Sequence, residues 1–337
     1  EEMGLKVEEV DNIMGSIIGR PKSAVYRTLD IVGLDIAMMV AQNTYKNCPE
    51  DEERSLFSNE TILNKLVEAG RLGQKSREGF YKKTGAEILS LDFETLEYTP
   101  QKKVRFDGYR LAKQQNTTAG KIRALAYSED KAGKFFWEAM AQSFIYSANR
   151  IPEISDEIIG IDNAMKWGFG YELGIFESWD AIGVKKSVNK MKDEGKKIPK
   201  WVETMLDKGK ESFYSQEERW RTFYSISNSN YKKVNLREKE INLALAKSSG
   251  GLVKRNLSAS IIDLGEGILN IEFHSSLQPT MNPIDHSLAS TINEGLDLLD
   301  SGNYIAMLIG HQGQHFCAGA NLALILEACE NESWNLL

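Results

Sequence analysis

The feature that most constrains this chain is an internal repeat, in which one pattern of residues occurs twice. Residues 10–35 read VDNIMGSIIGRPKSAVYRTLDIVGLD, and residues 161–184 read IDNAMKWGFGYELGIFESWDAIGV. A weaker match joins residues 62–81 to residues 198–214, and both of these segments end in Phe-Tyr. Self-similarity of this kind predicts two related structural units. We place them at residues 1–100 and 120–230.

Apolar residues in both units recur every three or four positions, which predicts helices with one buried face. In the first unit these are Val7, Val10, Ile13, Met14 and Ile17, then Ile31, Leu34, Ala37, Met38 and Ala41, then Ile62, Leu66 and Ala69; in the second they are Phe136, Met140, Phe144 and Ala148, then Ile158, Ile161 and Met165. Asp30 and Asp180 occupy equivalent positions in the repeat. We interpret both as acids that brace a turn by bonding nearby backbone amides, rather than as catalytic groups.

The composition changes after residue 230. Residues 231–257 are polar and basic and include Ser248-Ser249-Gly250-Gly251, which predicts a linker with a flexible joint. The pattern that follows predicts a hairpin around Gly265-Glu266-Gly267, a helix at 285–301, a strand at 304–309 and a loop that leads into a helix. We therefore expect a mainly α fold class, with two repeated helical domains followed by an α/β segment at 258–337.

Charge and cysteine content narrow the possible classes. The net charge of −7 argues against nucleic acid as the main partner, because phosphate binding needs a basic face. No apolar run approaches the ~20 residues that span a bilayer. Cys48, Cys317 and Cys329 lie far apart, without a metal-ligand spacing or a disulfide framework. We expect a reducing, cytoplasmic location and no membrane span.

All four histidines follow residue 273, so acid–base chemistry before that point would need Asp, Glu, Lys or Tyr. His311 and His315 are four residues apart and could be read as metal ligands. No third ligand stands at a recognisable spacing, and we favour exposed loop histidines and no metal.

Two segments carry a resemblance to one family. Residues 71–83, RLGQKSREGFYKK, resemble the closing motif of the C-terminal domain of 3-hydroxyacyl-CoA dehydrogenases, of the form (F/L)GxKxxxGFY. The matching positions are Gly73, Lys75, Gly79, Phe80 and Tyr81. The second unit resembles the same domain at Gly170, Gly174, Phe176, Glu177 and Asp180, with Ile175 in place of a proline. The resemblance implies two tandem copies of this domain that together shape an acyl-CoA cleft.

The last segment is similar to the crotonase (enoyl-CoA hydratase/isomerase) family. The resemblance rests on residues 268–299 and on IAMLIGHQGQHFCAGANLALI, in which the family signature F-x-A-G-A-D-L stands as Phe316–Leu322 with Asn321 in place of Asp. It implies that the backbone N–H of Ala320 is an oxyanion donor. It also implies that Ala318, Gly319 and Leu322 lie near the CoA thioester.

Together the resemblances imply part of a multifunctional enzyme of fatty acid β-oxidation, which oxidises 3-hydroxyacyl-CoA with NAD and hydrates enoyl-CoA. Dehydrogenases of this family carry a Rossmann domain whose GxGxxG loop binds NAD, and this sequence contains no such loop. Asn149-Arg150 lies too close to Asp162 to be the family's substrate-contacting Asn. We expect no Rossmann domain, NAD bound by a domain absent from this chain, and incomplete active sites in this chain alone.

A second interpretation is a non-catalytic assembly module of helical repeats with a degenerate crotonase piece. The flanking gene sequence would separate it from the enzyme. For either, we expect pseudo-dimeric packing of the two helical units and homo-oligomers through the crotonase part. The Lys102-Lys103 and Lys254-Arg255 pairs are candidate contacts for CoA phosphates, although solvated charge is the simpler interpretation.

Overall fold

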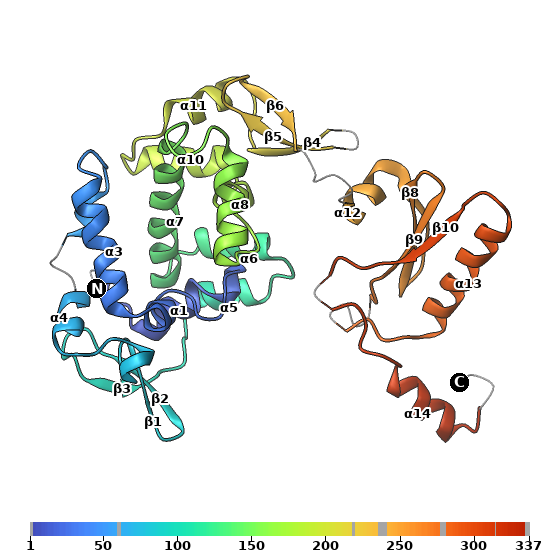
Figure 1. The fold of residues 1–337 in the computed structure, drawn as a ribbon, viewed down its shortest axis with the longest axis horizontal. Helices are drawn as coiled ribbons and strands as arrows, with labels where there is room; N and C mark the ends of the chain where they lie inside the picture. The colour runs from blue at the N-terminus through green and yellow to red at the C-terminus, as the bar shows by residue number, and fades with distance from the viewer. Residues whose placement is uncertain are drawn as a thin grey trace. The chain divides into compact units, whose positions relative to one another are not determined.

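The computed structural model describes residues 3–58, 62–217, 220–234, 241–276, 281–313 and 315–333. The chain divides into two compact units (Figure 1). One comprises Glu1–Tyr214 with Tyr224–Asn230, and the other comprises Ser215–Phe223 with Tyr231–Leu337.

The first unit begins with short helices and a small sheet. Its elements are α1 (Val7–Ile13), η1 (Ser16–Ile18), α2 (Tyr26–Val32), α3 (Leu34–Asn47), η2 (Arg54–Phe57), α4 (Ile62–Glu68), η3 (Gln74–Ser76), β1 (Tyr81–Thr84), β2 (Glu87–Leu91) and β3 (Tyr98–Pro100). The three strands form an antiparallel sheet in the order β1-β2-β3.

Longer helices follow. They are α5 (Asp107–Lys113), α6 (Thr118–Ala126), α7 (Lys131–Asn149), α8 (Ile158–Phe169), α9 (Ile175–Ile182), α10 (Val184–Asp193) and α11 (Lys200–Asp207). Three strands then form a second sheet in the order β4 (Tyr214–Glu217), β5 (Trp220–Ser225) and β6 (Asn230–Lys233). The sequence of helices and then a three-stranded sheet thus occurs twice.

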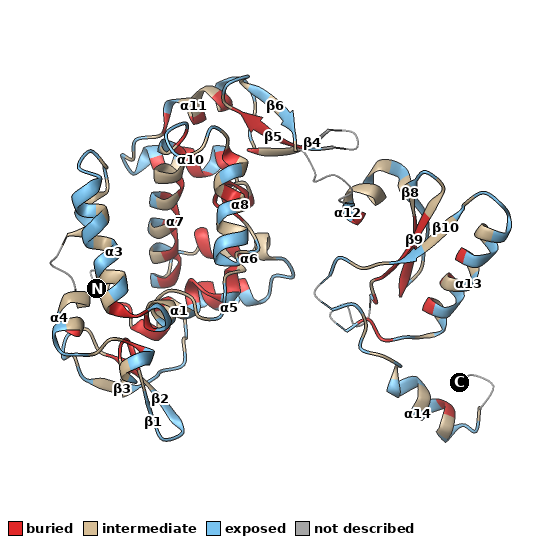
Figure 2. Cartoon of the chain, viewed as in Figure 1, coloured by how far each residue is buried: buried red, intermediate tan, exposed pale blue. Residues whose placement is uncertain are grey.

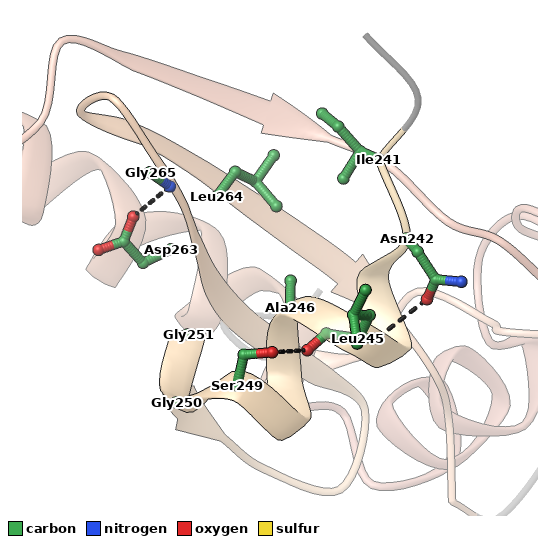
Figure 3. A pocket seen from close by; sticks show the side chains of 10 residues that line it. All are labelled: Ile241, Asn242, Leu245, Ala246, Ser249, Gly250, Gly251, Asp263, Leu264 and Gly265. Carbon is green, nitrogen blue, oxygen red and sulfur yellow. Dashed lines mark hydrogen bonds between the residues drawn. The ribbon is translucent and has the colours of Figure 1, made fainter. Parts of the chain in front are cut away.

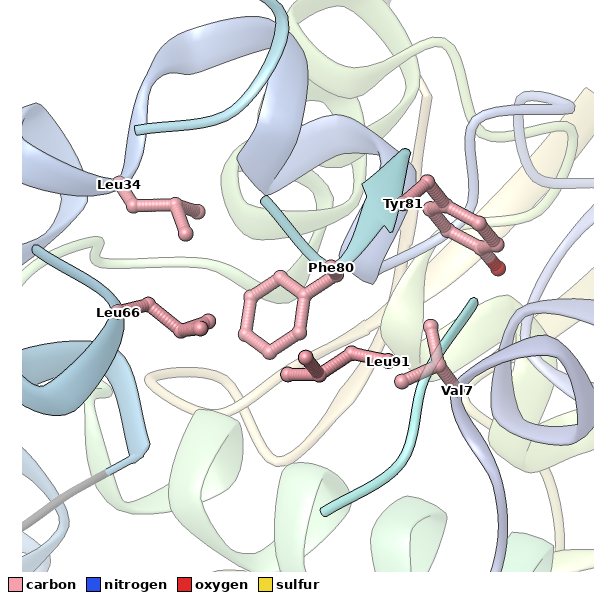
Figure 4. Packing of buried hydrophobic residues seen from close by; sticks show 6 residues of the cluster. All are labelled: Val7, Leu34, Leu66, Phe80, Tyr81 and Leu91. Atoms are coloured by element: carbon pink, nitrogen blue, oxygen red, sulfur yellow. The ribbon is translucent and has the colours of Figure 1, made fainter. Parts of the chain in front are cut away.

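Phe80 lies at the centre of the first hydrophobic core (Figure 4). Its neighbours come from α1, α3, α4 and the sheet: Val7, Leu34, Leu66, Tyr81 and Leu91. The ring centroid of Tyr26 lies 4.5 Å from that of Phe80. The Phe-Tyr pair that ends the first repeat therefore packs the sheet against the helices.

The second core is built on the buried face of α7. Phe136, Met140, Phe144 and Ala148 are each at most 1% exposed, which confirms the apolar stripe predicted for this helix. Phe144 stacks on Trp179 with ring centroids 5.0 Å apart. Figure 2 shows the contrast between α7, which is buried along one face, and α3, which is exposed along most of its length.

The other unit contains a four-stranded sheet. Its elements are α12 (Leu243–Ala246), the π-helical turn η4 (Lys247–Gly251), β7 (Leu252–Arg255), β8 (Ala259–Gly265), β9 (Ile268–Phe273), α13 (His286–Asp300), β10 (Ala306–Ile309) and α14 (Leu322–Glu330). The strand order is β10-β9-β8-β7, and only β10 pairs with its neighbour in parallel. The antiparallel β8–β9 pairing confirms the predicted hairpin.

The core of this sheet lies on the face that α13 covers. Leu288 of α13 packs against alternate residues of the two central strands, Ala259, Ile261, Leu269, Ile271 and Phe273. Such alternation follows from strand geometry, because successive side chains point to opposite faces. None of the described helices in the chain is long and apolar enough to cross a lipid bilayer.

The expected fold class, mainly α with two repeated helical domains, a crotonase-like α/β segment and no Rossmann domain, is wrong. The finding that overturns it is a three-stranded sheet in each stretch expected to be helical. These strands are only three to six residues long, and such short, partly polar segments carry little periodic signal. The chain has a mixed α and β structure.

Two smaller expectations also differ from the structure. Ile31 was expected in a buried stripe but is 56% exposed, because α2 ends at Val32 and Gly33 separates it from α3. The linker expected at 231–257 contains α12, η4 and β7, and residues 235–240 of it lie outside the described residues. The expected domain boundaries stay predictions.

Candidate functional site

Asp11 in α1 binds the first turn of α2. Its Oδ1 accepts hydrogen bonds from the N–H groups of Val25 (3.0 Å) and Tyr26 (2.8 Å), and its Oδ2 accepts from the N–H of Arg27 (3.0 Å) and the hydroxyl of Tyr81 (2.9 Å). The first N–H groups of a helix have no partner within that helix. Asp11 thus supplies the cap of α2 from a different helix and ties the sheet to both.

Asp30 at the other end of α2 binds the start of β1. Its two carboxylate oxygens accept from the N–H groups of Phe80 and Tyr81, each at 2.8 Å. A Cβ on Gly79 would lie 2.1 Å from Asp30 Oδ1, and a Cβ on Gly73 would lie 2.4 Å from the Asp30 carbonyl oxygen. The two glycines of the GxKxxxGFY motif therefore let the chain wrap closely around Asp30.

The second repeat makes corresponding bonds, with one backbone N–H fewer at the first aspartate. Asp162 accepts from the N–H groups of Phe176 (2.8 Å) and Glu177 (3.0 Å) at the start of α9, and from the hydroxyl of Tyr214 (2.9 Å). Asp180 accepts from the N–H groups of Phe213 (2.7 Å) and Tyr214 (2.8 Å). We call the Asp11–Asp30–Phe80–Tyr81 set the first network and the Asp162–Asp180–Phe213–Tyr214 set the second network.

Burial dominates the electrostatics of both networks. It raises the pKa of Asp11 and Asp30 above the usual range, although their hydrogen bonds oppose the shift. It raises the pKa of Asp162 to about 6, with a further increase from the nearby charge of Glu177. Burial and the neighbouring Asp11 also raise the pKa of Tyr81. The carboxylates act as acceptors that join three segments of chain, which is a structural role.

This result refines the interpretation of Asp30 and Asp180. Both bind backbone amides, as a bracing acid would. The amides are not local, however, because they lie 50 residues after Asp30 and 33 residues after Asp180. The sequence contained a signal for this pairing, since the recurring acids and the recurring Phe-Tyr both belong to the repeat.

The loop before α14 carries the residues expected to contact a thioester. The N–H of Ala318 donates to the Met281 carbonyl oxygen (2.7 Å), and the Gly319 carbonyl oxygen accepts from the N–H of Ile284 (2.8 Å). Ala320 is exposed, and its N–H has no hydrogen-bond acceptor among the described residues. Leu322, the first residue of α14, is 76% exposed.

Asn321, which replaces the Asp of the family signature, has a structural role of its own. Its side-chain oxygen accepts from the N–H of Ala323 (3.2 Å), so it is the N-cap of α14. Asn and Asp are similarly good at this position. The replacement of the family's Asp by Asn therefore preserves the helix start.

The two histidines of this loop differ from each other. His315 is exposed, whereas His311 is half-buried with its Nε2 3.3 Å from Asn282 Nδ2. Asn282 also donates to the His315 carbonyl oxygen (3.0 Å) and so holds the loop. Across the described part of the chain, no three His, Cys, Asp or Glu side chains gather as metal ligands would.

A cavity of about 350 Å³ lies between α12, η4 and the β8–β9 turn (Figure 3). Its polar groups bind one another: Asn242 accepts from the N–H of Leu245, Ser249 donates to the Leu245 carbonyl oxygen, and Asp263 accepts from the N–H of Gly265. Three residues of the expected flexible joint line it as part of a π-helical turn: Ser249, Gly250 and Gly251. We assign this cavity no ligand.

Several candidate basic residues have partners within the protein. Lys254 pairs with Glu294 (2.7 Å). The backbone N–H of Lys102 donates to Glu8 Oε1 (3.1 Å). Arg150 forms ion pairs with Asp51, Glu52 and Glu153, and Asn149 donates to Glu52 Oε1 (3.1 Å).

Comparisons with known proteins agree with the first resemblance. Residues 1–83 match the family "3-hydroxyacyl-CoA dehydrogenase, C-terminal domain". The "Probable 3-hydroxyacyl-CoA dehydrogenase" of Bacillus subtilis is 43% identical over 331 residues, which are 98% of this chain and 41% of the relative. A protein of the same name from Deinococcus radiodurans is 43% identical over 95 residues, 28% of this chain and 27% of the relative.

A more distant relative is the fatty acid oxidation complex trifunctional enzyme of Rickettsia prowazekii. It is 24% identical over 338 residues, which are 97% of this chain and 41% of the relative. No solved structure is significantly similar to the chain. The chain thus contains a C-terminal domain of the 3-hydroxyacyl-CoA dehydrogenase type, and it is homologous to the Bacillus dehydrogenase and the Rickettsia trifunctional enzyme over nearly all its length.

The chain spans 41% of the length of the Bacillus and Rickettsia relatives. The matches do not support the expectation that NAD binding is absent from this chain, because the Bacillus dehydrogenase aligns with nearly all of it. They bear on the dehydrogenase resemblance and leave the crotonase resemblance and the residues of the Ala318–Leu322 loop as predictions.

Proposed function

We propose that the protein containing this chain oxidises 3-hydroxyacyl-CoA thioesters to 3-ketoacyl-CoA with NAD, as part of fatty acid oxidation. One observation carries the proposal: residues 1–83 match the dehydrogenase C-terminal domain and the aligned relative is a dehydrogenase by name. The close approach of Gly73 and Gly79 to Asp30 supports it, because it explains why the motif of this domain has glycine at both positions.

The test is an absorbance assay of NADH formation by the whole protein with 3-hydroxyacyl-CoA substrates of short, medium and long chain. Formation of NADH is expected with at least one of them. The matched control is the free 3-hydroxy acid without CoA, which should not react. Absence of turnover with every thioester would contradict the proposal. Calorimetry of the 337-residue chain with NADH separately decides whether NAD binds here or in another domain.

A second activity, hydration of enoyl-CoA, is favoured by the backbone N–H of Ala320, which has no acceptor within the described part of the chain. Hydration builds negative charge on the thioester oxygen, and fixed N–H groups aimed at that oxygen stabilise the charge. Gly319 has a φ of +90°, a backbone conformation that glycine adopts readily, and it forms the turn that precedes α14. In this proposal Ala320 donates to the oxyanion, and Ala318, Gly319 and Leu322 contact the CoA thioester.

Ala320→Pro tests this role because proline has no N–H. We expect the hydratase rate of the whole protein to fall about 100-fold, the scale of losing one oxyanion donor. Ala320→Gly is the matched control, since it keeps the N–H, and its effect should be small. A folded Ala320→Pro variant, checked by circular dichroism, that kept its hydratase rate would exclude the assignment. Its dehydrogenase rate should not change.

We further infer that the chain contains two tandem copies of one module, each with helices and a three-stranded sheet. The closely similar bonding of the two networks supports this, as do the similar backbones of Gly33 (φ 102°, ψ 126°) and Gly183 (φ 97°, ψ 108°). The proposed packing about a pseudo-two-fold axis is supported by contacts between equivalent loops. The N–H of Glu172 donates to the Gly19 carbonyl oxygen (2.8 Å), and Arg20 lies 4.5 Å from the ring centroid of Tyr171.

A further inference from the structure

A cavity of about 320 Å³ opens beside the first network. Two cationic side chains, Lys22 and Arg27, line it together with the exposed hydroxyl-bearing Ser16. Both cations are exposed, and neither forms an ion pair with a carboxylate among the described residues. The Arg27 guanidinium lies 5.9 Å from the centroid of the Tyr81 ring, and its charge acts on the buried Asp30.

The corresponding place in the second network is closed. Arg27 follows the α2 start as Glu177 follows the α9 start, and each donates its N–H to the network aspartate. The Glu177 carboxylate is only 7% exposed and pairs with Lys166 at 2.9 Å. Lys166 aligns with Gly15, which has no side chain to offer to Arg27. Among the described residues, Arg27 therefore forms no direct ion pair at the place where Glu177 pairs with Lys166, although its charge lowers the pKa of the buried Asp30.

Two carboxylates also line the cavity, and their charges must be considered. Asp11 accepts hydrogen bonds from three backbone N–H groups and from Tyr81. Glu8 accepts from the Ser90 hydroxyl (2.7 Å) and from the N–H of Lys102 (3.1 Å). Protein donors thus occupy the oxygens of both carboxylates, whereas the N–H donors of the Lys22 and Arg27 side chains are directed to solvent or ligand.

We propose that this cavity binds a phosphate group, with Lys22 and Arg27 as its charged contacts and Ser16 as a neutral donor. Two cations match the charge of a phosphate monoester, and the planar guanidinium suits bidentate contact with phosphate oxygens. The cavity is larger than one phosphate, so it has room for the group to which the phosphate is attached. The second network, sealed by its ion pair, does not bind this ligand.

The test measures binding by calorimetry to the 337-residue chain with four probes: inorganic phosphate, CoA, dephospho-CoA and acetate. Arg27→Gln should weaken phosphate or CoA binding about fivefold, and Lys22→Gln with Arg27→Gln about twentyfold. Both side chains are exposed and the backbone N–H of residue 27 is kept, so the fold should persist. Lys83→Gln, an exposed residue of β1 outside the cavity, removes the same charge and should have no effect.

The outcomes separate the sources of the phosphate. Tighter binding of CoA than of dephospho-CoA would assign the site to the 3′-phosphate of CoA. Equal binding of the two, still dependent on Arg27, would assign it to a pyrophosphate. Binding of acetate as tight as that of phosphate, equal binding by Arg27→Gln, or no binding up to about 20 mM would overturn the proposal. The result does not depend on either proposed enzymatic activity, because no turnover is measured.

Discussion

The two networks share their internal hydrogen bonds and differ in what surrounds them. In the first, α3 leaves Ile36, Met39 and Val40 between 41% and 57% exposed. In the second, α10 has polar residues on its outer side. Lys186 of this helix lies 3.7 Å from the ring centroid of Tyr127, the C-cap residue of α6. Bonds to buried backbone amides allow few substitutions, whereas outward-facing side chains are free to change with their surroundings.

The comparison depends first on the aspartates of the networks being important for stability, which a variant of the second network tests. Asp162 is fully buried, and Asp162→Ala leaves two backbone N–H groups and a tyrosine hydroxyl without their acceptor. We expect a loss of about 3 kcal/mol in the free energy of unfolding, measured with urea. Asp207→Ala, at an exposed aspartate, should change it by less than about 0.5 kcal/mol. Equal effects of the two variants would remove the structural role assigned to the network.

A second variant tests how far the two loops are interchangeable. The residue before Phe-Tyr is Gly79 in the first network and Ser212 in the second. A Cβ on Gly79 would lie 2.1 Å from Asp30 Oδ1 and 2.6 Å from the Gly73 Cα. Gly79→Ser should therefore destabilise the chain by about 2 kcal/mol.

The control for that variant is Gly168→Ala, where a Cβ would meet no atom within 4 Å inside α8. It should be neutral or stabilising by up to about 1 kcal/mol, because alanine favours a helix. Thermal unfolding of both variants measures the difference. If Gly79→Ser were as stable as the wild type, the close approach to Asp30 would not be a constraint.

The smallest expected effect concerns protonation. The pKa of Asp162 is raised from 3.8 to about 6, by burial and by Glu177. Because the folded value is the higher one, the stability linked to protonated Asp162 is fully present below its ordinary pKa. It is lost as the pH rises through about 6.

Carboxyl-carbon NMR titration of Asp162 measures this shift. Glu177→Gln should lower the pKa of Asp162 towards its usual range, because one of the groups that raise it is removed. Lys83→Gln, far from Asp162 in sequence and on the first sheet, should leave the titration unchanged. A titration of Asp162 that is the same with and without Glu177 would show that burial alone sets the pKa.

The sequence predicted the parts of this fold whose signal is local. Phe136, Met140 and Phe144 repeat at helical spacing, and each is buried on α7. The two three-stranded sheets were missed because a three-residue strand such as Tyr98–Pro100 has no periodicity to detect. Their stability comes from neighbours distant in the chain.

For the sites too, local signals could be predicted from the sequence and long-range partners could not. The repeat identified the aspartates, but their partners are set by tertiary structure 33 to 70 residues away. The oxyanion role that the family motif implies for Ala320 stays a prediction; among the described residues its N–H has no acceptor. The cavity at Lys22 and Arg27 had no sequence signal, because an unpaired cation looks the same as a paired one until its surroundings are known.

The tyrosine–aspartate bonds also bear on how the chain folds as it is synthesised. Tyr81 reaches back 70 residues to Asp11, and Tyr214 reaches back 52 residues to Asp162. The difference in loop length changes the closure entropy by only about 0.3 kcal/mol, so neither loop has a thermodynamic advantage. Order of emergence from the ribosome decides instead, since domains fold as units from the N-terminus. The Tyr81–Asp11 bond can form as soon as Tyr81 has emerged, whereas the Tyr214–Asp162 bond must wait until Tyr214 follows.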